Sequence, residues 1–183
     1  SLNGAGAVTW ANGTTGITGN INYGNSLTGT NTSDHVGSHG IVALNNGNYL
    51  GRTPRWGNRA GAVTWGNGTT VITGQISSSN SLVGNYNIPD AVGYWPIIIL
   101  SNNNYLVRTA NWGNGAGAVT WGNGTTGITG QISSSNSLVG SKANDMAGIV
   151  IAEAGNNYIV NNPNWDNGAV PDVGAVTLGN SAN

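Results

Sequence analysis

A short apolar string recurs along the chain at nearly constant intervals, and this period constrains the fold more than any single side chain. The string AVTW occupies residues 7–10, 62–65 and 118–121, and a diverged copy, AVTL, occupies residues 175–178. The successive offsets are 55, 56 and 57 residues. A long internal period is typical of units that bury their apolar faces against neighbouring units, so the sequence predicts a stacked or radial array.

The period divides the chain into units of similar length. We interpret residues 1–183 as one repeat domain, with units at about 34–89 and 90–144 flanked by partial units at 1–33 and 145–183. With 38% apolar residues, a chain of this length can bury a real core.

Each unit carries four short segments with the patterning of strands. In the unit 90–144 these segments are residues 94–100, 105–108, 118–121 and 137–139. The connections between them are rich in Asn and Gly, which favour tight turns. The chain holds 31 glycines and shows no helical periodicity, so we expect an all-β fold.

A unit of about this length with four antiparallel strands matches one blade of a β-propeller. The main alternatives are a three-fold β-prism and a β-trefoil. Counted in this way the chain has thirteen strands, one more than three blades need, and its last blade lacks a fourth strand. The strand at residues 26–28 is expected to complete that blade, either within one chain or in a homodimer that closes a six-bladed ring, because an unpaired strand edge favours pairing.

The segments 34–52, 90–108 and 145–161 resemble the FG-GAP repeats of integrin-type propellers. That family binds calcium through Asp-rich loops. The corresponding loops here read NNGN, SNNN and EAGNN, so no metal or other cofactor is expected.

A more specific resemblance rests on the segments NNYIVNNPNWDNG at 156–168, GAVTWGNGTTGITG at 117–130 and SNSLVGS at 135–141. These segments are similar to the repeats of large secreted bacterial proteins, including filamentous haemagglutinin-like adhesins. The resemblance implies a secreted or cell-surface protein.

Charge and composition exclude several classes of partner. With five basic and six acidic residues the formal charge is −1, so the chain lacks the clustered cations that nucleic acids require. The longest apolar run, residues 97–100, is far too short to insert into a membrane. Cysteine is absent, which excludes disulfides and thiolate catalysis.

Repeated aromatic and amide residues form the candidate ligand site. Trp10, Trp65 and Trp121 end the AVTW strings, and we expect them to pack between units. A second Trp series lies between Asn and Gly residues, where an exposed ring could stack on a sugar while amides bond its hydroxyl groups. The candidate ligand-binding residues are Trp56, Trp112, Trp165, Asn58, Asn114, Asn167, Arg52 and Arg108. A simple hydrogen bond at the rim of the unit is the alternative role for the two arginines.

Other polar residues suggest structural roles. Asp34, Asp90 and Asp145 precede the first strand of each unit, where a carboxylate can accept backbone N–H groups and fix a turn. His35 and His39 occur in one unit only, and neighbouring glycines argue against a helical metal site. We therefore expect no enzyme activity. The leading hypothesis is an extracellular binding or adhesion module, with multivalent carbohydrate recognition, and the alternative is a structural spacer of a giant surface protein.

Overall fold

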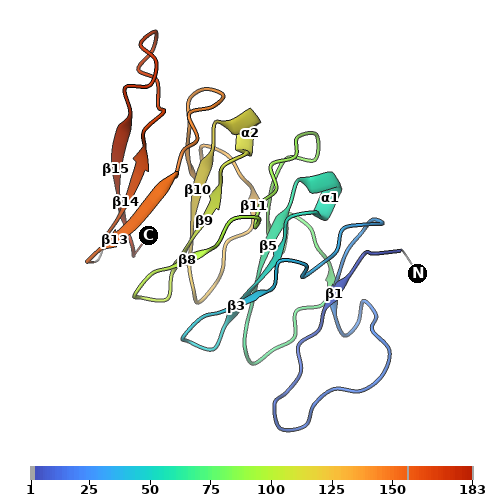
Figure 1. The fold of residues 1–183 in the computed structure, drawn as a ribbon. Coiled ribbons are helices and arrows are strands. Elements are labelled where there is room, and N and C mark those ends of the chain that lie inside the picture. Colours follow the sequence, from blue (N-terminus) through green and yellow to red (C-terminus); the bar gives the residue numbers. More distant parts are fainter. Residues whose placement is uncertain (1–2, 156, 183) are drawn as a thin grey trace.

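The computed structural model describes residues 3–155 and 157–182, and its regular structure consists almost entirely of short strands. The strands form four small sheets that follow one another in a row (Figure 1). The row begins with β1 (Ala7–Val8) and ends with β15 (Ala175–Asn180), at opposite ends of the molecule. The expected all-β class and repeated units are confirmed. The described residues form an open row, not the closed ring of a propeller or the three-fold closure of a prism or trefoil.

The unit predicted from residue 90 onward shows the expected strand order. Its four strands are antiparallel neighbours in chain order, as predicted: β8 (Ile98–Ile99), β9 (Tyr105–Thr109), β10 (Ala118–Gly122) and β12 (Leu138–Val139). The first strand is shorter than the predicted 94–100, and Pro96 supplies a reason because its nitrogen cannot donate to a ladder.

The other units repeat this order as far as the chain allows. The preceding unit contains β3 (Ile41–Ala43), β4 (Tyr49–Thr53), β5 (Ala62–Gly66) and β7 (Leu82–Val83). The first sheet pairs β1 with β2 (Leu27–Thr28), and the last contains β13 (Val150–Ala154), β14 (Asn157–Asn162) and β15.

Two additional strands join neighbouring units. β6 (Gly74–Gln75) pairs in parallel with β2, and β11 (Gly130–Gln131) pairs in parallel with β7. Each therefore lies beside the last strand of the preceding unit. Within one chain the strand at residues 26–28 does not complete the last blade, because β2 is already paired with β1 and β6. Closure between two chains stays a prediction.

Each full unit also contains one tight turn with helical hydrogen bonding, α1 (Trp56–Arg59) and α2 (Trp112–Gly115). The backbone of Gly57 and Asn58 is left-handed, with φ of 60° at both residues. Gly113 and Asn114 repeat this conformation with φ of 60° and 61°. Gly and Asn tolerate the left-handed region best, which explains why the expected WGN loops fold as compact turns.

The apolar core lies between successive sheets and not within a single unit. One cluster joins Leu50 and Val63 of one sheet to Tyr105 and Val107 of the next. A single sheet of this size cannot bury its own apolar face, so the units depend on one another for stability.

Candidate functional site

A buried aspartate lies at the start of each of three units: Asp34, Asp90 and Asp145. The side chain of Asp34 is 1% exposed, and its Oδ2 accepts hydrogen bonds from the backbone nitrogens of Thr30 and Asn31 at 2.7 and 2.8 Å. Its Oδ1 accepts from the backbone nitrogen of Gly57 at 3.0 Å. The predicted turn role is therefore confirmed, and the carboxylate also holds the α1 turn in place.

Asp90 and Asp145 differ in how far their hydrogen bonds offset the increase in pKa that burial causes. Burial raises the pKa of Asp90, whose bonds from Asn85 and Gly113 do not compensate fully. Burial opposes ionisation of Asp145 too, but bonds from Lys142 and from both the backbone and the hydroxyl of Ser141 lower its pKa overall. The balance between burial and the accepted hydrogen bonds decides the direction of each shift.

The second Trp series does not form a set of exposed sugar platforms. Trp56 is 1% exposed and belongs to the core, where its ring lies 5.0 Å from that of Tyr86 in the following loop. The expectation of an exposed ring is wrong at this position, because the ring packs in a core cluster and Tyr86 lies beside it. Trp112 and Trp165 are half-buried, and Trp112 packs against the core.

The amides next to this series remain accessible. Asn58 and Asn114 are exposed at the tips of the α1 and α2 turns, and Asn167 is exposed in the last unit. Asn167 closes a small hairpin by exchanging backbone hydrogen bonds with Val170. The structure thus separates these amides from the buried Trp56 ring that was expected to act with them.

The two arginines of the candidate site contact the loop that contains Trp95, Arg52 from the preceding unit and Arg108 from the same unit. Arg52 donates to the carbonyl oxygens of Gly93, Tyr94 and Trp95 at 2.9, 2.7 and 3.0 Å. The guanidinium of Arg108 lies 4.6 Å from the centre of the Trp95 ring. Burial lowers the pKa of both arginines. Arg52 therefore makes the rim hydrogen bonds that we considered, and Arg108 replaces them with a cation–π contact.

The AVTW tryptophans link units through a shared carbonyl. The indole nitrogen of Trp65 donates to the carbonyl oxygen of Gly124 at 3.1 Å, and the side-chain amides of Asn46 and Asn48 donate to the same oxygen at 2.9 Å. The next step repeats the arrangement at the Ser181 carbonyl, with donors from Trp121, Asn102 and Asn104. Trp10 likewise donates to Gly68. The expected packing of this series between units is confirmed, although its rings are half-buried.

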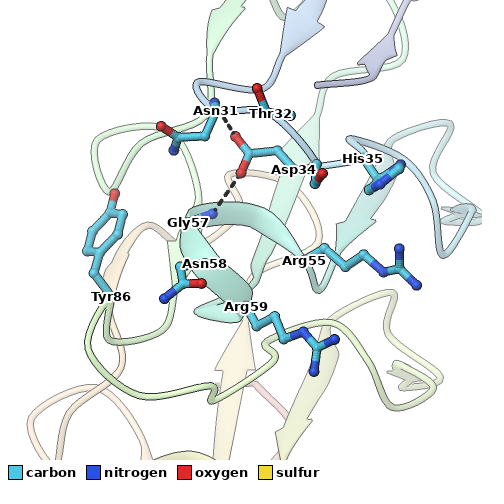
Figure 2. A pocket seen from close by; sticks show the side chains of 10 residues that line it. Asn31, Thr32, Asp34, His35, Arg55, Gly57, Asn58, Arg59 and Tyr86 are labelled. Carbon is cyan, nitrogen blue, oxygen red and sulfur yellow. Dashed lines mark hydrogen bonds between the residues drawn. The ribbon is translucent and has the colours of Figure 1, made fainter. Parts of the chain in front are cut away.

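A hollow of about 540 Å³ lies beside the α1 turn (Figure 2). Its lining includes Asn31, Asp34, His35, Asn58 and Tyr86, and also Arg55 and Arg59 of the turn. Figure 2 shows Arg55 and Arg59 leaving the turn on the side opposite Tyr86. On that side a second cleft of about 390 Å³ is lined by residues of two successive units: His39, Pro54, Arg55, Arg59, Pro89, Ala91, Tyr94 and Asn111.

A family model described as a repeat of unknown function (DUF5650) matches residues 1–38, 43–94, 99–149 and 153–183. The chain belongs to this repeat family. No curated protein matches the chain. The match confirms the repeat nature that the AVTW period predicts, while the family description names neither haemagglutinin-like nor FG-GAP repeats.

The arginine-lined cleft of this repeat-family member was missed by the sequence analysis. The sequence did contain a signal, because three of the five basic residues, Arg52, Arg55 and Arg59, are clustered between positions 52 and 59. Burial and the nearby charges of Arg52 and Arg55 lower the pKa of His39, which places the imidazole in a positive environment.

Two further structural findings concern residues 3–155 and 157–182. No helix there is long and apolar enough to cross a membrane. No group of three or more His, Asp or Glu side chains converges there in a way that could hold a metal ion.

Proposed function

We propose that the chain is a non-enzymatic segment of an extracellular repeat array that acts mainly as a rigid spacer. The observation that carries the proposal is the convergence of Asn46, Asn48 and Trp65 on the carbonyl of Gly124, repeated one unit later at Ser181. Repeat-equivalent polar and aromatic side chains thus join units to each other. Such coupling favours a stiff array over a set of identical open pockets.

Two further features support this role. Parallel strand pairing by β6 and β11 adds backbone hydrogen bonds between units to these side-chain contacts. The resemblance of residues 156–168, 117–130 and 135–141 to haemagglutinin-like repeats favours a secreted or cell-surface location.

Adhesion through glycan binding is the second candidate function. It is favoured by the hollow of about 540 Å³ beside α1, where the half-exposed ring of Tyr86 and the amides of Asn31 and Asn58 meet. An aromatic face beside amide groups suits the two sides of a sugar ring. The tryptophan triplet expected from the sequence contributes less to this candidate, since Trp56 is buried.

Small-angle X-ray scattering on the chain and on a tandem fusion of two copies tests the spacer function. A stiff open row predicts an elongated particle whose largest dimension grows in proportion to the number of units. Trp65→Phe should increase flexibility because it keeps the ring but removes the donor to Gly124. A compact particle that barely lengthens on doubling would show a closed assembly and contradict the spacer role.

A further inference from the structure

The cleft between the α1 turn and the following loop concentrates cations in a chain that has few. Arg55 and Arg59 both line it, beside the imidazole of His39. Among residues 3–155 and 157–182, the ion pair that the structure shows joins Lys142 to Asp166, away from this cleft. The charges of Arg55 and Arg59 are therefore not neutralised by a neighbouring carboxylate.

The nearest acidic groups are occupied elsewhere. Asp34 and Asp90 are each 1% exposed, and both carboxylates accept backbone hydrogen bonds within their own turns. Neither lines the cleft of about 390 Å³. An anion that entered the cleft would meet two free guanidinium groups, whose planar forks match carboxylate and sulfate oxygens.

The scaffold does not need an arginine at either position. The residues equivalent to Arg55 are Asn111 and Asn164, and those equivalent to Arg59 are Gly115 and Gly168. Arg59 has a φ of 69°, in the left-handed region, where the two glycines have φ of 87° and 63°. A side chain at such a position carries a conformational cost that glycine avoids, and outliers of this kind concentrate at functional sites.

The rest of the cleft has the chemistry of a sugar site. Tyr94 is 51% exposed, and its ring is fixed by contacts with His39 at 5.4 Å and with Trp95 at 5.5 Å between ring centres. Arg52 holds the Tyr94 carbonyl at 2.7 Å, so it acts as a positioning residue for this loop. Asn111 adds an amide, and the volume of about 390 Å³ falls within the range of small-ligand sites.

We propose that this cleft binds an acidic saccharide, a sugar that carries a carboxylate or sulfate group. Arg55 and Arg59 bond the anionic group, Tyr94 packs against the C–H face of the sugar, and Asn111 bonds a hydroxyl group. The site occurs once and lies between two units, so it is compatible with the spacer role and does not depend on it.

Calorimetric titration at low ionic strength tests the proposal with sodium glucuronate, glucose, sodium sulfate and adenosine monophosphate as probes. Glucuronate should bind most tightly, because it alone combines a sugar ring with a carboxylate. Arg55→Asn and Arg59→Gly should each weaken glucuronate binding by about tenfold or more, as expected for a charge-assisted bond. Both variants copy the neighbouring units, so their unfolding midpoints should equal or exceed that of the parent.

Lys142→Gln is the matched control, because it removes one positive charge at an exposed position outside the cleft. It should retain the parent affinity for glucuronate. Several results would overturn the proposal: no binding of glucuronate, equal affinity for glucose, equal affinity for sulfate alone, tighter binding of adenosine monophosphate, or unchanged glucuronate affinity in both arginine variants.

Discussion

The ring of Tyr105 lies over the backbone of Gly122, its register partner on the neighbouring strand. A Cβ atom added to Gly122 would come within 2.2 Å of the Tyr105 Cζ atom. Tyr49 covers Gly66 and Tyr158 covers Gly179 in the same register, each with a 2.2 Å approach. The glycine that follows AVTW or AVTL is thus required by an aromatic ring across the sheet, which restores apolar cover where a glycine has no side chain.

Gly122→Ala should destabilise the fold by about 1–3 kcal/mol, because the new methyl group forces the buried Tyr105 ring out of its position. Chemical denaturation measures the change in the free energy of unfolding. Gly13→Ala is the control, since no atom lies within 4 Å of a Cβ at that position. A Gly122→Ala variant as stable as the control would show that the ring moves freely.

Alkaline pH should weaken the same contact. Burial raises the pKa of Tyr49, Tyr105 and Tyr158 above the ordinary tyrosine value of about 10. The folded state therefore favours the neutral phenol, so this stabilisation is complete below about pH 10 and is lost as the pH rises toward the folded-state pKa. Unfolding curves between about pH 8 and about pH 11 measure the loss.

Tyr105→Phe separates this effect from general alkaline damage, because phenylalanine does not ionise. Its stability should fall less steeply with pH than that of the parent chain. Parallel slopes for the two proteins would mean that Tyr105 does not control the alkaline transition.

Trp56→Ala should lower the free energy of unfolding by about 3–5 kcal/mol, as expected for a fully buried aromatic residue. Trp112→Ala should lower it by less, because the Trp112 ring is only half-buried. Thermal unfolding of both variants gives the comparison. Equal losses would indicate that α1 and α2 surround their tryptophans in the same way, against the difference in exposure.

Asp145→Asn should destabilise the chain more than Asp90→Asn at neutral pH. The pKa of Asp145 is lowered, so its carboxylate stabilises the fold above the unfolded pKa of about 4, and this contribution disappears as the pH falls through the lower folded value. The pKa of Asp90 is raised, so its folded environment favours the neutral group that asparagine imitates. Unfolding free energies at neutral and acidic pH give the comparison, and an equal loss for both variants would contradict it.

The sequence predicted the parts of the fold that depend on local pattern. The order of β8, β9, β10 and β12 follows from alternating apolar residues and Asn-Gly turns, and the role of Asp34 follows from the preference of carboxylates for turn N–H groups. Whether the sheets close into a ring depends on small rotations between units, which no local pattern encodes. β6 and β11 escaped prediction because two residues, Gly and Gln, carry no strand signal.

The candidate site was harder to predict for a related reason. Trp56 lies among Asn and Gly residues that indicate a loop, yet Tyr86 of the next loop covers its ring. The arginine cleft is formed by residues of two units, so only the clustering of basic residues could have indicated it. The sequence thus indicated which residues repeat, but it did not indicate which of them are exposed, because exposure depends on neighbouring units.

The last sheet exposes an apolar face, whereas the equivalent face of an interior sheet is covered by the following unit. Val176 is 72% exposed and Leu178 is 66% exposed, whereas Val119, the counterpart of Val176, is 3% exposed. The Val119 side chain lies against Gly148 of the following unit. The face of the last sheet is therefore shaped to receive another unit of the same kind.

We expect concentration-dependent association through this face. The two ends of the row differ, so a second copy should add head to tail and form open chains in preference to the six-bladed ring. Sedimentation velocity should show species that grow with concentration, and Val176→Lys with Leu178→Lys should abolish them. Ile41→Lys, at a position 48% exposed on a sheet edge, is the control and should associate as the parent does. A discrete dimer independent of concentration would instead favour ring closure between two chains.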